Sequence, residues 1–198
     1  MAHIHTGPGE HDLTVSAFIV KTTYGVPRLL LHRHKTLGIM IQPGGHVELT
    51  ENPWQALAHE LVEETGYNLS QLWVLQPDVT PPTMGDAVCH PQPMCVRTFS
   101  YDKTTNHYHI DLSWGFITAE EPQGLPGEGE SQELVWVSAE ELATMKDTYE
   151  DVRVTGLYLL NTLVNEWHPK WTGHWGLENP PTPGDFPDDQ PDKVSRPS

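Results

Sequence analysis

The 198-residue sequence predicts one domain of the α/β class, followed by a tail. Apolar and β-branched runs typical of strands alternate with segments that have the period of an amphipathic helix. The hydrophobic content of 37% is ordinary for a chain with one folded core. From Pro169 onward the composition is rich in Pro, Gly and Asp and cannot order itself alone. We expect an N-terminal segment over residues 1–11, a domain over residues 12–168, and a Pro-rich, partly disordered tail over residues 169–198.

The first expected elements are strands. Residues 12–22 and 27–35 are apolar or β-branched runs separated by the turn signal Tyr24-Gly25. This pattern predicts a hairpin or two neighbouring strands. A short third run covers residues 39–42.

Residues 52–66 carry a clear helix signal. Asn52 is a good N-cap, Pro53 suits the first helical position, and Gln55 completes the spacing of a capping box. Gly66 is placed to end the helix. The expected apolar face consists of Trp54, Leu57, Ala58, Leu61 and Val62.

After this helix the sequence predicts more strands and two closing helices. The strands are expected at residues 71–79, 94–101, 107–118 and 133–137, with a Pro-rich loop over residues 81–93, and the helices at residues 139–145 and about 149–168. Trp167, Trp171 and Trp175 then follow at four-residue spacing. This spacing favours packing of the first part of the tail on the domain, and a ligand-stacking role is the alternative.

The formal net charge of −16 argues against a nucleic acid or an anionic membrane as the partner, because both are polyanions. No run approaches the roughly 18 to 20 apolar residues that a membrane span needs. The N-terminus also lacks the order of basic and apolar residues that marks a signal peptide. We expect a cytoplasmic protein with a small-molecule partner, and a homodimer stays open.

Glu60, Glu63 and Glu64 are the most informative charged residues. At spacings i, i+3 and i+4 their carboxylates share one face of the helix, and residues 43–67 contain no Lys or Arg to pair with them. Repulsion between these unpaired carboxylates destabilises the helix. A divalent cation bound among them removes this destabilisation, and Mg²⁺ binds carboxylate oxygens while keeping water ligands for a phosphate substrate. A solvated acidic face is the alternative. The preceding Gly44-Gly45 favours the metal, because glycines let the backbone approach a ligand closely.

The spacing of these residues resembles the signature of the Nudix hydrolases, G-x5-E-x7-R-E-U-x-E-E-x-G-U, where U is aliphatic or aromatic. One position departs from the signature: His59 stands where the family has arginine, so the usual positive partner of Glu51 is replaced by a group that is largely neutral near pH 7. The resemblance implies an α/β/α sandwich with a mixed β-sheet. The chain supplies the signature residues Gly45, Glu51, Glu60, Leu61, Glu63, Glu64, Gly66 and Tyr67.

The resemblance also implies an enzyme, a Mg²⁺-dependent pyrophosphohydrolase that cleaves a nucleoside diphosphate linked to another moiety. Mg²⁺, with Mn²⁺ as a substitute, would be held by Glu60, Glu63, Glu64 and the Gly44 carbonyl. Glu64 would thereby take part in catalysis, and Glu51 would orient the site rather than bind the metal.

In several family members the general base lies outside the signature, on a loop before a late strand. The corresponding region of this chain contains Glu128, Glu130 and Glu133. We expect Glu130 to be the base, and solvated loop acidity is the alternative.

Several of the twelve histidines fall near this expected site. His46 follows Gly45 directly, and His107, His109 and Asp111 alternate along one expected strand and so face the same side of the sheet. An H-x-H pair on a strand can bind zinc, but a closed zinc site needs further ligands that the sequence does not place. We favour His46 and His109 as substrate-binding residues, with polar strand positions as the alternative.

Two basic residues, Arg33 and Lys35, lie at the end of the second expected strand. Because the chain has few cations, they are candidate phosphate contacts. Surface charges at a strand end are an equal alternative.

Two other functions compete with the hydrolase. A Nudix-fold sensor would bind a nucleotide derivative without cleaving it, but such domains typically lose signature glutamates that this chain keeps. An isopentenyl-diphosphate isomerase uses a catalytic cysteine in a segment similar to the one at Cys89. That segment precedes the metal-binding helix in the isomerase, whereas Cys89 follows Gly66, so the isomerase is less favoured.

Overall fold

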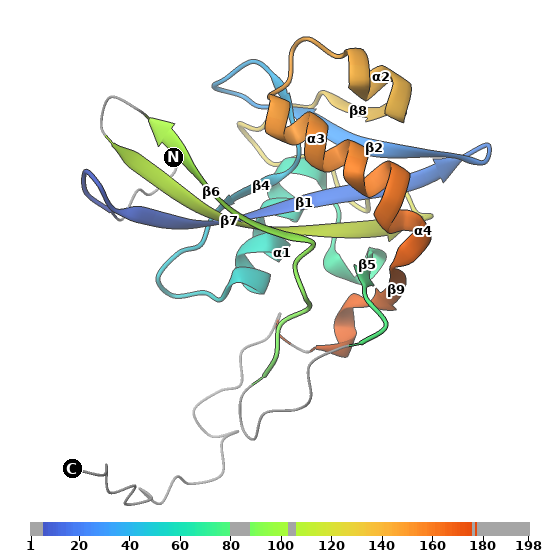
Figure 1. Cartoon of the computed structure of the whole chain (residues 1–198), viewed down its shortest axis with the longest axis horizontal. Helices are drawn as coiled ribbons and strands as arrows, with labels where there is room; N and C mark the ends of the chain where they lie inside the picture. Colours follow the sequence, from blue (N-terminus) through green and yellow to red (C-terminus); the bar gives the residue numbers. More distant parts are fainter. Residues whose placement is uncertain (1–5, 80–87, 103–105, 176, 178–198) are drawn as a thin grey trace, which may run out of the picture.

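The structure, a computed structural model, describes residues 6–79, 88–102, 106–175 and 177 (Figure 1). The strands are β1 (His11–Thr23), β2 (Val26–Arg33), β3 (Met40–Ile41), β4 (Gly44–His46), β5 (Trp73–Gln76), β6 (Cys95–Asp102), β7 (His107–Thr118), β8 (Leu134–Val137) and β9 (His168–Trp171). The helices are α1 (Pro53–Thr65), α2 (Ala139–Thr144), α3 (Glu150–Tyr158) and α4 (Val164–Glu166), with a π-helical segment η2 (Leu159–Leu163) and the 3-10 turns η1 (Leu69–Gln71) and η3 (Thr172–His174).

One mixed sheet forms the centre of the domain. Its main path has the order β3-β2-β1-β7-β5-β9, and β4, β6 and β8 pair with β1, β7 and β2 respectively. β1 and β7 are parallel, from His11 opposite Tyr108 to Lys21 opposite Thr118. The remaining strand pairs are antiparallel.

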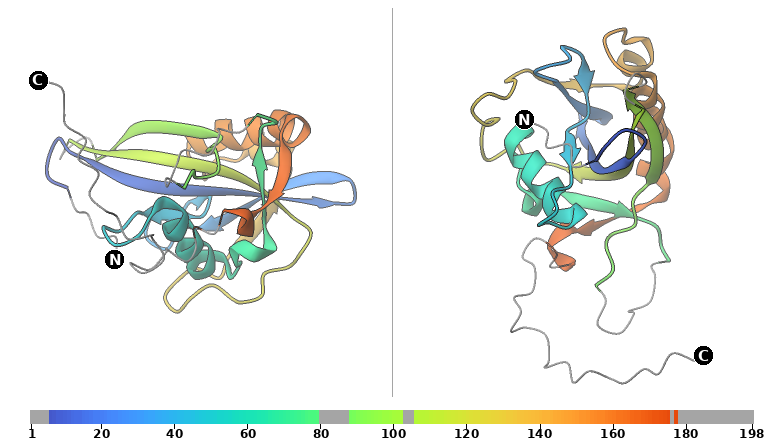
Figure 2. Two further views of the ribbon diagram at one scale, coloured as in Figure 1. Left: turned by 90° about the horizontal axis from the view of Figure 1, so that it is seen from below. Right: turned by 90° about the vertical axis from the view of Figure 1, so that its left-hand side faces the viewer.

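Helices cover both faces of this sheet, with α1 on one side and α2, α3 and α4 on the other (Figure 2). Because successive residues of a strand point to opposite faces, β1 supplies side chains to the hydrophobic core on each face of the sheet. Val15, Ala17 and Ile19 belong to the core under α1, and Phe18 and Val20 belong to the core under the other helices. The α/β/α sandwich with a mixed sheet is therefore confirmed. No helix of the described residues is long and apolar enough to cross a membrane.

α1 has the ends that the sequence predicts. The Asn52 side chain accepts hydrogen bonds from the backbone N–H groups of Trp54 (2.9 Å) and Gln55 (3.0 Å), and the Gln55 side chain accepts one from Asn52 N–H at 2.8 Å. Gly66 ends the helix with a φ of 74°, and a Cβ there would lie 2.3 Å from the Gly124 carbonyl oxygen. Glycine is required at this position both for its left-handed conformation and for the close contact.

Two strands differ from the sequence-based expectation. β4 is short and contains two glycines, which gives it no strand signal, and it forms because it pairs with β1. β9 lies mainly in the segment expected to be a tail and pairs with β5, so that Trp73 is opposite Trp171. The expected long helix over residues 149–168 is divided into α3, η2 and α4, and it ends before β9.

The residues after β9 also pack on the domain. The buried Thr172 hydroxyl donates to the carbonyl oxygens of Leu69 (2.6 Å) and Leu72 (3.1 Å). Trp175 lies against Trp54 with ring centroids 6.3 Å apart, and Leu177 is buried in the core under α1. Packing is therefore the role of Trp175. Residues 178–198 of the expected tail lie outside the described residues.

Removing residues 168–198 should destabilise the protein by at least about 3 kcal/mol, since burying one large apolar side chain contributes about 1.5–3 kcal/mol and β9 is lost as well. Removing only residues 180–198 should leave the stability unchanged. Urea unfolding of both shortened chains and the full chain measures the difference. Equal midpoints for the two shortened chains would show that β9 and Leu177 do not stabilise the domain.

Candidate active site

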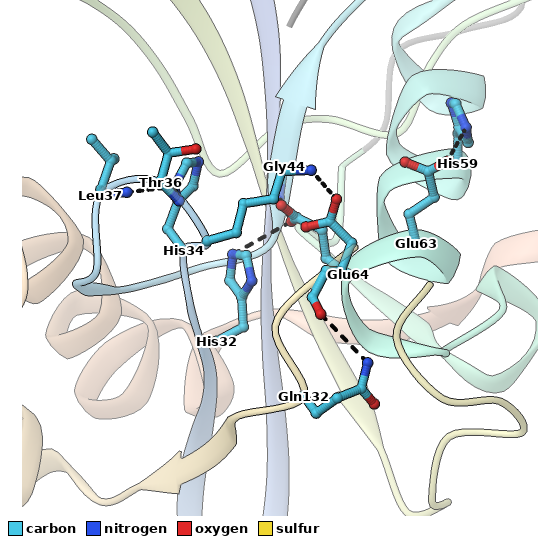
Figure 3. Close-up of polar contacts among 11 residues, drawn as sticks. His32, His34, Thr36, Leu37, Gly44, His59, Glu63, Glu64 and Gln132 are labelled. Atoms are coloured by element: carbon cyan, nitrogen blue, oxygen red, sulfur yellow. Dashed lines mark hydrogen bonds and ion pairs between the residues drawn. The ribbon is translucent and has the colours of Figure 1, made fainter. Parts of the chain in front are cut away.

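The candidate site forms where β4 lies against α1. The backbone N–H of Gly44 donates to Glu64 Oε2 at 2.9 Å (Figure 3). A Cβ at Gly45 would lie 2.0 Å from Glu60 Oε1, and one at Gly44, whose φ is 155°, would lie 2.1 Å from the Val15 carbonyl oxygen. Any side chain at these two positions would therefore separate the strand from the carboxylates or from β1. The glycine pair brings the backbone directly to Glu60 and Glu64.

The burial of Glu60 and Glu64 makes negative charge at this site unfavourable. Burial, reinforced by neighbouring carboxylates that include Glu63 and Glu130, raises the pKa of Glu60 to about 7. Burial and the adjacent Glu60 raise the pKa of Glu64 to about 9. A bound divalent cation would stabilise both charged forms. These oxygen donors therefore fit the Mg²⁺ site that the sequence predicts.

Glu63 and Glu51 do not point toward Glu60 and Glu64 but contact other residues. Half of the Glu63 side chain is exposed on the outer side of α1, and its Oε1 lies 3.0 Å from His59 Nε2 (Figure 3). Glu51 Oε1 instead accepts a hydrogen bond from the backbone N–H of Glu48 at 2.9 Å, in the loop before α1. In this structure the residue that replaces the family arginine contacts Glu63 rather than Glu51.

Glu130 reaches the same site from the loop before β8. Its side chain is 12% exposed and forms an ion pair with Lys35. Its charge contributes to the raised pKa values of both Glu60 and Glu64, which places it close to them. The loop is tied to α1 because Gly127 N–H donates to the Glu63 carbonyl oxygen at 2.7 Å. Two residues expected from sequence, Glu130 and Lys35, thus meet beside the glutamate cluster.

Arg33 is held by contacts within the protein. Its guanidinium donates to both carboxylate oxygens of Glu133, at 2.6 Å and 2.9 Å, and to the Gly38 carbonyl oxygen at 2.7 Å. Asp147 lies 3.4 Å away as a further partner. A phosphate would have to compete with these contacts, so the geometry favours a structural role at the end of β2.

His32 also lies at the site, although it is not among the four expected substrate-binding residues. It is 1% exposed, and its Nε2 lies 3.5 Å from Glu64 Oε2 (Figure 3). Burial, together with the nearby His34, lowers the pKa of His32 to about 4, so the ring is neutral at pH 7 and the contact is not an ion pair. The alternation His32-Arg33-His34 is the sequence signal for this position, because residues two apart in an extended segment point to the same side.

The other two expected substrate-binding residues, His46 and His109, lie together in a buried cluster with Asp12 and His107. Asp12 Oδ2 is 3.1 Å from His107 Nε2 and 3.8 Å from His46 Nε2. The His109 ring contacts both other rings edge-on, with centroids 4.8 Å from His46 and 5.1 Å from His107. Burial, followed by the neighbouring histidines, lowers the pKa of His109 to about 4. Sequence reasoning found the histidines but missed Asp12.

Comparison with known proteins identifies the family. Residues 10–155 match the family described as the NUDIX domain. A NUDIX-family hydrolase from Clostridium perfringens is 28% identical, with a TM-score of 0.59, covering 77% of this chain and 97% of that chain. No curated protein sequence matches the chain. The chain belongs to the NUDIX family, and with its glutamate cluster it is a hydrolase of pyrophosphate bonds.

Two further solved structures share the fold at lower identity. An Ap4A hydrolase from C. elegans, in a binary complex, is 19% identical with a TM-score of 0.57, covering 78% of this chain and 98% of that chain. The NUDIX domain of Shewanella oneidensis NrtR, complexed with ADP ribose, is 13% identical with a TM-score of 0.53, covering 73% and 84%. These two similarities show a shared fold only.

The metal-free protein should lose stability as the pH rises from about 5 to 9. Glu60 and Glu64 have pKa values of about 7 and about 9 in the folded chain against an ordinary value of 4.5, so the folded chain binds more protons in this range. The two carboxyl groups contribute their full stabilisation at a pH below 4.5. This contribution is lost as the pH rises through about 7 for Glu60 and about 9 for Glu64. Thermal unfolding with a chelator at several pH values measures this dependence.

The Glu64→Gln variant should show a flatter pH dependence, because glutamine does not titrate. The control is Glu63→Gln, which removes a half-exposed carboxylate from the same helix. Added Mg²⁺ should raise the melting temperature of the wild type more at high pH. An identical pH dependence in the wild type and Glu64→Gln would refute the role of Glu64 burial.

Proposed function

We propose that the protein is a Mg²⁺-dependent pyrophosphohydrolase that cleaves a nucleoside diphosphate linked to another moiety. The observation that supports this proposal is the convergence of the partly buried Glu60 and the buried Glu64 on the Gly44-Gly45 backbone, with Glu130 beside them. Two carboxylates that are wholly or partly buried, on a helix without Lys or Arg, favour a divalent cation. A cytoplasmic location stays a prediction.

The proposed metal ligands are Glu60, Glu63, Glu64 and the carbonyl oxygen of Gly44. When bound, Mg²⁺ or its substitute Mn²⁺ supplies charge neutralisation for the diphosphate and acidifies a water molecule. The Gly44 N–H holds one oxygen of Glu64 and leaves its other oxygen for the metal. Glu63 has to turn from His59 into the site, and a half-exposed side chain has the freedom to do so.

Glu130 is the proposed general base. Its carboxylate accepts a proton from the attacking water, the water oxygen forms a bond to phosphorus, and the anhydride P–O bond breaks to release a phosphate product. Lys35 pairs with Glu130 in the absence of substrate. An arriving diphosphate offers Lys35 a second anion, which would free Glu130 to accept the proton. Lys35 is thus the proposed phosphate contact at this site.

Two solved structures with the same fold support the proposed substrate class. The C. elegans structure is an Ap4A hydrolase, and the NrtR domain was crystallised with ADP ribose. Both compounds contain a nucleoside diphosphate joined to a further group. We therefore propose substrates of this kind for the present chain.

The first test is a panel of Ap4A, ADP-ribose, nucleoside triphosphates and nucleotide sugars with Mg²⁺, following the release of phosphate or nucleoside monophosphate. Glu64→Gln should lower turnover of the best substrate by at least about 10²-fold, since metal ions supply several kcal/mol of charge stabilisation. The control is Glu166→Gln, which changes an exposed glutamate on α4, on the face of the sheet opposite α1. This variant should keep the wild-type activity. Unchanged turnover in Glu64→Gln would refute the metal assignment.

The second test concerns the base. Glu130→Gln should lower kcat by roughly 10² to 10⁴ while Mg²⁺ and substrate binding persist, as expected when a general base is lost. Glu128→Gln is the matched control, because it removes an exposed glutamate from the same loop. Calorimetric titration with Mg²⁺ and a nonhydrolysable substrate analogue separates binding from turnover. Equal kcat values for the wild type and Glu130→Gln would assign the base to another residue.

A further inference from the structure

A second group of ligand-type side chains, separate from the glutamate cluster, is brought together by three strands. Asp12 on β1 is opposite His109 on the parallel strand β7, and His107 shares the face of His109 two residues earlier. On β4, His46 is opposite Thr14, which shares the face of Asp12. Strand pairing and alternation therefore place these four ligand-type side chains on one face of the sheet.

This face is not the one that carries the glutamate cluster. Gly45 is opposite Val15, which packs under α1, and the position of its missing side chain is filled by the Glu60 carboxylate. His46, the next residue, points to the other side because neighbouring residues of a strand alternate. β4 thus supplies the glycine pair to one site and a histidine to another.

The four side chains have the geometry of an unassembled metal centre. One ligand atom from each lies within 4.8 Å of every other, and Asp12 Oδ2 lies 3.1 Å from His107 Nε2 and 3.8 Å from His46 Nε2. Tetrahedral Zn²⁺ with bonds of about 2.0–2.2 Å holds its ligand atoms about 3.4 Å apart. On binding the ion, the ligand atoms that lie farther apart than this would have to move closer together.

We propose that Asp12, His46, His107 and His109 bind a Zn²⁺ ion. Three imidazole nitrogens favour Zn²⁺ over Mg²⁺, which prefers oxygen ligands. Four protein ligands complete a tetrahedral shell and leave no position for substrate, which is the arrangement of a structural zinc site. The side chains of Asp12, His107 and His109 are each at most 7% exposed, so bulk water is largely excluded.

A direct ion-pair contact between Asp12 Oδ2 and His107 Nε2 explains the shortest of these distances without a metal. His46 and His109 come from two different strands, and strand register brings them to the same point. The two rings approach edge-on at 4.8 Å, and His109 approaches His107 similarly at 5.1 Å. A cation at the centre accounts for all four residues.

Bound Zn²⁺ would fasten β4 to β1 and β7. His46 directly follows Gly45, the residue whose backbone lies against Glu60. The ion would therefore stabilise the strand that positions the catalytic glutamates without taking part in the reaction. This role is independent of the proposed substrate and of Mg²⁺.

The test measures Zn²⁺ binding to the full chain. The protein is freed of metal with a chelator, supplied with Zn²⁺ in the presence of excess Mg²⁺, and passed through a desalting column before elemental analysis. We expect one Zn²⁺ retained per chain and a higher melting temperature than for the metal-free protein. Absence of retained Zn²⁺ in the wild type would overturn the proposal.

Variants then locate the ion. His109→Gln and Asp12→Asn should each weaken Zn²⁺ affinity by at least about tenfold, since even residues that only support metal ligands contribute 10- to 100-fold. His168→Gln is the matched histidine control, because this exposed residue at the start of β9 pairs with Asp78, which follows β5. Glu64→Gln should also retain Zn²⁺ while losing hydrolysis, which separates this proposal from the proposed function. Unchanged affinity in both ligand variants, or loss in Glu64→Gln, would place the ion elsewhere.

A spectroscopic measurement covers the case in which both ligand variants fail to fold, as judged by circular dichroism without metal. Co²⁺ replaces Zn²⁺ in wild-type protein, and its visible absorption distinguishes tetrahedral from octahedral coordination. A strong tetrahedral spectrum that Zn²⁺ abolishes and Mg²⁺ leaves unchanged is expected. A weak octahedral spectrum, typical of oxygen ligands and water, would overturn the proposal.

Discussion

The parallel pairing of β1 with β7 is the contact on which the rest of the structure depends. It joins strands that are separated by about half of the chain and forms the centre of the sheet that α1 and α3 cover. It aligns the polar starts of both strands, so that Asp12 meets His109 and the hydroxyls of Thr14 and Ser16 donate to Asp111. The other edge of β1 pairs with β4, the strand that carries the glycine pair.

At the candidate active site, the environment of Glu60 and Glu64 disfavours the negative charge that these side chains carry when ionised. Leaving Glu60 and Glu64 ionised costs free energy in a buried place, and their raised pKa values express that cost. The fold maintains this arrangement because the apolar face of α1 packs on the sheet and Gly44 and Gly45 have no side chains to push it away. A cation would convert the unfavourable charge into a binding contribution, so metal binding should stabilise the folded chain.

The three-residue strand β4 contributes to two different candidate sites, one on each face of the sheet. Gly45 lies against the carboxylates under α1, and His46 joins three other ligand-type side chains on the opposite face. Oxygen donors on one face suit Mg²⁺, and imidazoles on the other suit Zn²⁺. The alternation of a β-strand is sufficient to keep the two sites apart, although they share one short strand.

The sequence by itself determined the elements whose signals are local. The capping box of α1, the spacing of Glu60, Glu63 and Glu64, and the extent of β7 needed no distant partner, because side-chain periodicity and capping act over a few residues. Only the tertiary structure decided what depends on contacts between distant segments. β4 and β9 are strands because β1 and β5 offer them backbone hydrogen bonds, and Arg33 is occupied by Glu133 rather than left for a phosphate. Asp12 became a candidate ligand only through its position opposite His109, since strand register is a property of the folded sheet that local sequence does not specify.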